Sequence, residues 1–210
     1  MQSPKTGMMH LSPLRRGDPA RRNPWPRLLI GLPAALLLLG ALLYGGWLWR
    51  EEYRRSHAYD TLIREAARRY GLPPCLVKGL IRQESRFRAD TTGHSGEIGL
   101  MQIMPGAIQD WERTTGRRCQ SRGAAYDPRL NLEIGCWYLA LAMRRWDGRA
   151  DRWEMALAQY NAGPANAARW GRDDAARSLY ERVRFPSTRR YIKNVLEYAR
   201  NYERQHAFDQ

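Results

Sequence analysis

The sequence predicts an all-α protein in which a helical domain follows a single transmembrane helix near the N-terminus. Residues 28–49 form a run without any charged side chain. From residue 50 onward, apolar residues recur at the spacing of amphipathic helices, between prolines that can begin a helix and glycines that can end one. No alternating strand pattern or hairpin signal stands out. The 210 residues suffice for one medium-sized domain and such an appendage.

The N-terminal 27 residues differ in composition from the rest. They contain five prolines, and six Lys or Arg against one Asp, which gives a net charge of +5. They show no hydrophobic period, and a segment with few apolar residues cannot bury enough surface to offset the entropy of ordering the chain. The sequence therefore predicts that residues 1–27 form a disordered basic tail.

The uncharged run of residues 28–49 predicts a transmembrane anchor. Its 22 residues match the roughly 20 that a helix needs to cross a bilayer. Tyr44, Trp47 and Trp49 gather at its distal end, as aromatic residues do at a membrane interface. The basic residues before the run place the tail in the cytoplasm and residues 50–210 on the opposite side. The alternative is a cleaved signal peptide; the length of the run and the lack of a small-residue cleavage site favour the anchor.

Residues 50–210 are expected to form one domain of helices, most of them bounded by proline and glycine. Asp127 followed by Pro128 is a typical helix start, because the carboxylate can cap the helix and proline suits its first position. In order, the expected helices cover about residues 62–70, 74–84, 105–115, 128–146, 152–162, 164–170 and, after a cap at Ser187, a last helix to about residue 202.

Glu84 is the first candidate catalytic residue. Leu76 and Leu80, with Val77 and Ile81, precede it at helical spacing, so its carboxyl shares the apolar face of its helix. Burial of a carboxyl raises its pKa, because the charged form loses its water. A carboxylic acid that stays protonated near neutral pH can donate a proton to a leaving group.

Two further segments carry candidate polar residues. A polar, turn-rich loop over residues 88–97 is followed by an apolar run that Gln102 interrupts, and Pro105 ends that run. Later in the chain, Tyr160 and Asn161 precede an Ala-Gly-Pro break between two helices. A polar amide inside an apolar run is unexpected for packing alone, so we expect Gln102 to reach a cleft that Glu84 also faces.

These segments resemble the three signatures of the soluble lytic transglycosylase (SLT) family, which shares the goose-type lysozyme fold. The matching segments read Glu84-Ser85-x-Phe87, then Gly99-Leu100-Met101-Gln102-Ile103-Met104-Pro105, then Ala158-Gln159-Tyr160-Asn161-Ala162-Gly163-Pro164. They occur in the family's order, and the resemblance covers about residues 59–202. It implies a lysozyme-like helical fold and makes residues 50–210 a lytic transglycosylase catalytic domain.

The resemblance also implies a reaction. Enzymes of this family cleave the β-1,4 bond between N-acetylmuramic acid and N-acetylglucosamine in peptidoglycan and leave a 1,6-anhydromuramyl end. Glu84 would be the single general acid and base, and the sugar's 2-acetamido group would stabilise the developing cation. Neither a cofactor nor a metal is implied. The location implied is the bacterial inner membrane, crossed once, with the catalytic domain in the periplasm.

Further site residues follow position by position from the resemblance. Asn161 is also suited to fixing the turn, and Tyr191 is equally well explained as a core tyrosine. The implied substrate-binding residues are Ser95, Gln102, Met104, Tyr160, Asn161 and Tyr191.

The chain departs from the family pattern at three places. At the start of the last helix, Ser187 stands where the family often has a glutamate, which puts a second carboxylate role there in doubt. Glu97 adds a carboxylate to the segment before Gly99, and we expect it to be a solvated loop residue. Gly93 stands where some members have a serine, so recognition of the acetamido group is expected to differ.

The net charge of the chain indicates which classes of partner it can bind. The formal net charge is +14, and residues 50–210 hold 29 basic and 20 acidic side chains. Such a surplus suits an anionic partner. The expected partners are peptidoglycan glycan strands, the membrane through the N-terminal helix, and cell-wall or secretion machinery. A cytoplasmic nucleic-acid binder is motivated by charge alone, lacks a recognisable motif and conflicts with the anchor, so no nucleic-acid partner is expected.

Two alternatives to a transglycosylase stay open at this point. One is a lysozyme-like hydrolase that cleaves the same bond with water. The other is a wall-binding scaffold of a secretion or assembly machine, which the retained Glu84, Gln102 and Tyr160 argue against.

The three cysteines contain no Cys-x-x-Cys pair, which argues against a zinc site. A bridge between Cys119 and Cys136 and two reduced cysteines are equally compatible with the sequence.

Overall fold

The structure is a computed structural model that describes residues 25–172, 177–205 and 207–208, with side chains from residue 33 onward. The chain divides into two units, Met1–Trp47 and Leu48–Gln210. Nearly all of the basic tail predicted for residues 1–27 lies outside the described residues.

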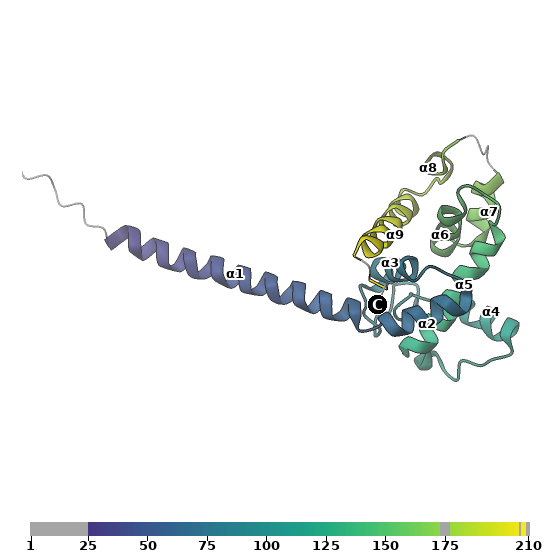
Figure 1. The fold of residues 1–210 in the computed structure, drawn as a ribbon, viewed down its shortest axis with the longest axis horizontal. Helices are drawn as coiled ribbons and strands as arrows, with labels where there is room; N and C mark the ends of the chain where they lie inside the picture. The colour runs from purple at the N-terminus through teal and green to yellow at the C-terminus, as the bar shows by residue number, and fades with distance from the viewer. Residues whose placement is uncertain (1–24, 173–176, 206, 209–210) are drawn as a thin grey trace, which may run out of the picture. The chain divides into compact units, whose positions relative to one another are not determined.

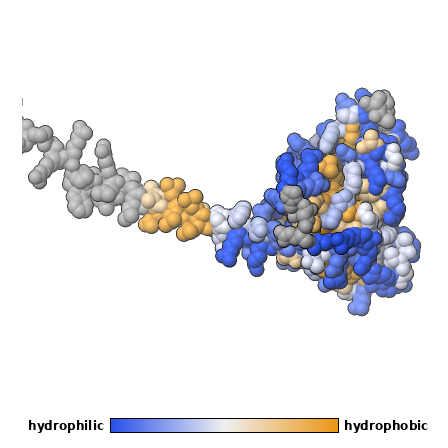
Figure 2. Space-filling view, viewed as in Figure 1, coloured by the Kyte–Doolittle hydropathy of each residue, from blue (hydrophilic) through white to orange (hydrophobic). Residues whose placement is uncertain are grey.

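α1 (Trp25–His57) is a helix of 33 residues that contains Pro33. Its leucines are exposed along its described length, and Figure 2 shows them as a continuous hydrophobic surface. Within the described residues, one helical stretch, Pro33–Tyr70, is long and apolar enough to cross a membrane by length and composition. The exposed apolar part of α1 falls inside residues 28–49, for which the sequence predicts the anchor.

The second unit is helical, which confirms the predicted fold class (Figure 1). Isolated antiparallel bridges pair Ile98 with Thr92 and with Ile103. The helices after α1 are α2 (Asp60–Tyr70), α3 (Pro74–Ser85), α4 (Pro105–Thr115), α5 (Pro128–Arg145), α6 (Arg152–Ala162), α7 (Pro164–Arg172), α8 (Leu179–Arg182) and α9 (Pro186–Arg204), with a 3-10 helix, η1 (Arg122–Tyr126), before α5.

Proline and glycine set several of these boundaries as the sequence predicts. Pro74, Pro105 and Pro128 each occupy the first turn of a helix. Asp127 caps α5 by accepting a hydrogen bond from the Leu130 backbone N–H at 2.9 Å. Gly116 ends α4 with a φ of 70°, a left-handed conformation that glycine adopts without steric cost.

The last helix corrects one prediction. Ser187 does not cap α9, because Pro186 begins the helix and Phe185 occupies the cap position without a side-chain hydrogen bond. The short helix α8 is absent from the prediction. Its signal was a capping box, in which Ser178 and Glu181 exchange side-chain and backbone hydrogen bonds.

α3 lies at the centre of this unit and packs along α9 (Figure 1). The two helices approach closely at Gly79, where an added Cβ would lie 2.8 Å from the Val195 carbonyl oxygen and 2.9 Å from the Ala199 nitrogen. A side chain at this position would push α9 away from α3. The glycine therefore fixes how near the C-terminal helix comes to the helix that carries Glu84.

Buried charges in this unit are paired. The Lys78 side chain is fully buried on α3 and donates to Asp60 Oδ1 at 2.6 Å. Glu133 of α5 accepts from Arg69, Arg117 and Tyr70 at 2.5 to 2.7 Å.

Cys119 and Cys136 are not bridged to each other. Cys136 is buried in α5, and Cys119 Sγ lies 3.2 Å from the Ser121 carbonyl oxygen, to which it donates. The structure thus answers the question that the sequence left open between a bridge and two reduced thiols.

Candidate functional site

Glu84 lies in the last turn of α3, next to the buried Ser85, and is only partly exposed. The hydroxyl of Tyr191, which α9 contributes, donates to Glu84 Oε1 at 2.6 Å. Tyr191 itself is 5 % exposed. The tyrosine is therefore a core residue, as one interpretation of the sequence has it, and it also contacts the carboxyl of Glu84, which the sequence did not predict.

The surroundings of Glu84 raise the pKa of its carboxyl to about 7. Burial is the largest cause, since the charged form loses hydration. The hydrogen bond from Tyr191 acts in the opposite direction, and the negative charge of Glu97 raises the pKa further. Glu84 thus exchanges its proton near neutral pH, which suits a group that must give a proton and later take one.

The backbone around the site is strained. Among the residues that the structure describes, three other than glycine have a positive φ: Arg86 at 51°, Phe87 at 61° and Gln102 at 46°. Two directly follow α3, and the third is the glutamine of the second motif. Such conformations cost of order 1–3 kcal/mol each and persist only where the surrounding structure holds them. Two of the three residues lie within three positions of Glu84 in the chain, and strained backbone of this kind clusters at functional sites.

Asn131 holds the second motif in place. Its side chain is buried in α5, accepts from the Met101 backbone N–H at 2.8 Å and donates to the carbonyl oxygens of Ile98 and Ala125 at 2.9 and 2.8 Å. Sequence reasoning did not single out this residue, because its partners lie up to 33 positions away.

Gln102 is fixed by its own amide. Its Nε2 donates to the carbonyl oxygens of Thr91 at 3.1 Å and Gly99 at 2.8 Å. Because both donors of the amide are used inside the protein, the Oε1 atom is what remains for another partner, and it lies beside Gly93.

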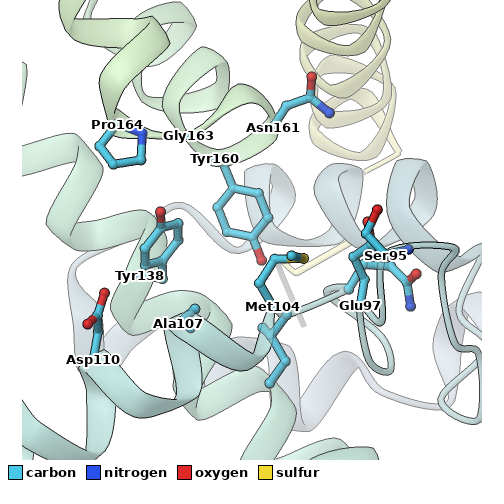
Figure 3. Close-up of a pocket in the computed structure, with 13 residues that line it drawn as sticks. Ser95, Glu97, Met104, Ala107, Asp110, Tyr138, Tyr160, Asn161, Gly163 and Pro164 are labelled. Carbon is cyan, nitrogen blue, oxygen red and sulfur yellow. The ribbon is translucent and has the colours of Figure 1, made fainter.

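A cavity of about 450 Å³ gathers most of the predicted binding residues (Figure 3). Figure 3 shows Tyr160 in its middle, between Tyr138 on one side and Met104 and Glu97 on the other. Ser95, Gln102, Met104, Tyr160 and Asn161 all line it.

The third motif positions Tyr160 and Asn161. The Tyr160 hydroxyl donates to the Met101 carbonyl oxygen at 2.8 Å, which ties α6 to the second motif. Burial, followed by the charge of Glu84, raises the pKa of Tyr160 well above its usual value, so the phenol stays protonated. Asn161 Oδ1 accepts from Thr188 Oγ1 at 2.8 Å, which links α6 to the first turn of α9.

Glu97 differs from the expectation of a solvated loop residue. It is only partly exposed, lines the cavity of Figure 3, and accepts a hydrogen bond from the Ser95 backbone N–H at 2.9 Å. Its Oε2 lies where a Cβ at Gly93 would stand. A side chain at position 93 would therefore require this carboxylate to move. Glu97 uses the space that the serine of some family members would take.

Glu84 itself lines a second cavity, of about 590 Å³, together with Gln83, Ser85 and Arg86. Across the described ranges, no group of three or more His, Cys, Asp or Glu residues is arranged to hold a metal ion.

The chain is similar to known proteins over this region. A family model described as "Transglycosylase SLT domain" matches residues 61–183. The soluble lytic murein transglycosylase of Escherichia coli K12 is 33% identical over 164 residues, which cover 75% of this chain and 25% of that protein. The membrane-bound lytic murein transglycosylase C of Salmonella paratyphi B is 28% identical over 172 residues, 72% of this chain and 48% of that protein.

A solved structure agrees with these relatives. The lytic transglycosylase Slt of Pseudomonas aeruginosa, crystallised as an inactive mutant with glutamine in place of one glutamate, superposes with a TM-score of 0.64 and 31% identity. The match covers 70% of this chain and 24% of that one. The chain thus spans between a quarter and a half of the length of the curated relatives it matches. Because the family model covers more than half of the 210 residues, the chain belongs to the transglycosylase SLT domain family.

Proposed function

We propose that the protein is a membrane-anchored lytic transglycosylase that cleaves the β-1,4 bond between N-acetylmuramic acid and N-acetylglucosamine in peptidoglycan. The observation that carries this proposal is the Glu84 carboxyl, which is partly buried at a cavity, bonded to Tyr191 and given a pKa of about 7. The relatives named above are murein transglycosylases, and one of them is inactive when a single glutamate becomes glutamine.

The proposed reaction uses Glu84 twice. Protonated Glu84 gives its proton to the oxygen of the leaving sugar as the glycosidic bond breaks. The 2-acetamido group of the muramyl unit stabilises the cation that develops at C1. The resulting carboxylate then takes the proton of the C6 hydroxyl, whose oxygen attacks C1 and closes the 1,6-anhydro ring. The proton returns to Glu84, so no water is consumed.

We further propose that α1 anchors the protein in the bacterial inner membrane over residues 28–49 and leaves residues 50–210 in the periplasm, where peptidoglycan lies. The exposed leucines of α1 and the basic residues before it support this arrangement.

Digestion of purified sacculi by the full-length protein in detergent tests the reaction. Mass spectrometry of the released muropeptides is expected to show 1,6-anhydromuramyl ends, which are one water lighter than reducing ends. Reducing ends would instead identify a hydrolase, for which Glu97 gives a specific basis, because its charge acts on the pKa of Glu84 and could make it the second carboxylate of such a reaction. Binding to sacculi without any cleavage would favour a scaffold.

The pH profile tests the part played by Glu97. Cleavage needs protonated Glu84, so kcat/KM is expected to fall as the pH rises through about 7, the pKa of that group. In Glu97→Gln the negative charge that raises this pKa is gone, so the fall is expected at a lower pH. A profile that keeps its position, measured from pH 4 to 9, would show that Glu97 does not act on Glu84.

A further inference from the structure

Two arginines follow α3 at the cavity that Glu84 lines. Arg86 and Arg88 both contribute to the wall of this cavity of about 590 Å³. Neither takes part in the reaction proposed above, and the matched family signature leaves position 86 open. Their placement at the same cavity as the candidate acid raises the question of what they bind.

The strained turn after α3 presents both guanidinium groups. Phe87, with a φ of 61°, is buried in the core at 2 % exposure, while Arg86 and Arg88 on either side of it are exposed. Arg88 Nε donates to the Ser85 carbonyl oxygen at 3.2 Å. This bond uses one donor and leaves the two terminal nitrogens of Arg88 for a ligand.

The two arginines lack a carboxylate partner in the described part of the chain. The other charged groups of the cavity are accounted for: Arg55 bonds to Glu51, Glu52 accepts from Arg82, and Glu84 is about half protonated near pH 7. Arg86 and Arg88 therefore bring positive charge to the cavity that no carboxylate of the described residues pairs with. The negative end of α3 offsets it in part, because helix C-termini carry a partial negative charge.

We propose that Arg86 and Arg88 bind a carboxylate of the peptide stems of peptidoglycan, and that they make the enzyme prefer strands with stems over bare glycan. This inference rests on the function proposed above. A muramyl unit held at Glu84 carries its stem next to the reacting bond, and stems bear free carboxylates. Guanidinium groups recognise carboxylates through paired, charge-assisted hydrogen bonds.

A lipid headgroup is the other anionic ligand that two arginines could take. The stem is favoured, because the arginines share a cavity with Glu84, whose ligand is the glycan, and because a headgroup phosphate would compete there with substrate.

The test compares two forms of one substrate. Soluble glycan strands with intact stems, and the same strands after an amidase has removed the stems, are cleaved by the full-length protein in detergent. Strand length is measured, which reports cleavage whatever the chemical nature of the new ends. The ratio of kcat/KM for the two substrates is expected to be about 10 for the unmodified protein, a preference typical of charge-assisted bonds.

In Arg86→Gln/Arg88→Gln the ratio is expected to approach 1, mainly through KM. Arg86→Lys/Arg88→Lys keeps the charge and is expected to retain part of the preference. The single variant Arg88→Gln leaves the strained position 86 untouched and is expected to show an intermediate ratio. The matched control is Arg118→Gln/Arg144→Gln, which removes the same charge from two exposed positions outside the cavity and is expected to keep the ratio.

Three results would overturn the inference. One is an equal loss on both substrates, which would indicate a role in shaping α3 rather than in binding stems. Another is an unchanged ratio in the double variant. The third is loss of binding to vesicles of anionic phospholipid with the stem preference kept. If the protein cleaves neither substrate, the proposed function fails, and fluorescence titration with free stem peptide decides the inference separately.

Discussion

Replacing Glu84 by Gln is expected to slow glycan cleavage by about 10³-fold or more, because one carboxyl serves as acid in the first step and as base in the second. Glutamine keeps the size of the side chain and can still accept the hydrogen bond from Tyr191, but it neither gives nor takes a proton. The rate of release of muropeptides from sacculi measures the loss.

The free energy of unfolding of Glu84→Gln and the activity of a variant at another glutamate provide the controls. Because burial raises the pKa of Glu84, its ionised form destabilises the folded protein at neutral pH, so the neutral glutamine is expected to keep or raise the free energy of unfolding at pH 7. Glu197→Gln, an exposed glutamate on α9, is expected to cleave at the normal rate. Normal cleavage by Glu84→Gln would remove the basis of the proposed mechanism.

Replacing Asp60 by Ala is expected to have the largest effect on stability, about 3 kcal/mol. The Lys78 ammonium group is fully buried, and Asp60 is its carboxylate partner at 2.6 Å. Removing one member of such a pair leaves a buried charge without compensation, which costs roughly 3–5 kcal/mol. The rings of Tyr202 and Phe208, 4.9 and 5.3 Å from the nitrogen, keep the loss near the lower end of this range.

A second substitution identifies the cause. In Asp60→Ala/Lys78→Met no charge is buried, so most of the lost stability is expected to return. Glu65→Ala removes a partner from the exposed pair with Arg129 and is expected to cost less than about 1 kcal/mol. Denaturant unfolding of the full-length protein, followed by tryptophan fluorescence, measures all three. A double variant as unstable as Asp60→Ala alone would contradict the explanation.

Local signals in the sequence predict most of the fold. Pro74, Pro105 and the Asp127-Pro128 pair mark helix starts, because their effects act within one turn of the chain. The predicted cap of α9 at Ser187 lies two residues too late, because Phe185 is the cap and Pro186 takes the first helical position. A four-residue helix such as α8 has too few residues to show a hydrophobic period.

In the candidate site, too, local sequence patterns predict some features, whereas contacts between distant residues are not predictable from them. The apolar spacing around Glu84 predicts a helix face and hence partial burial, and this agrees with the position of the carboxyl in the structure. Tyr191 lies 107 positions after Glu84 in the chain, so no local sequence pattern could predict the hydrogen bond between them. Glu97 looks like an ordinary loop residue in the sequence. The structure places its side chain against Gly93 and in the lining of the cavity.

The hydrogen bond between α3 and α9 ties the candidate acid to the C-terminal helix. The family match ends at residue 183, whereas the phenol that holds Glu84 comes from position 191. A nascent or clipped chain that lacks its final helix would keep the carboxyl and lose the hydroxyl that orients it. Under the proposed mechanism, cleavage therefore depends on α9 as well as on the residues that the family model matches.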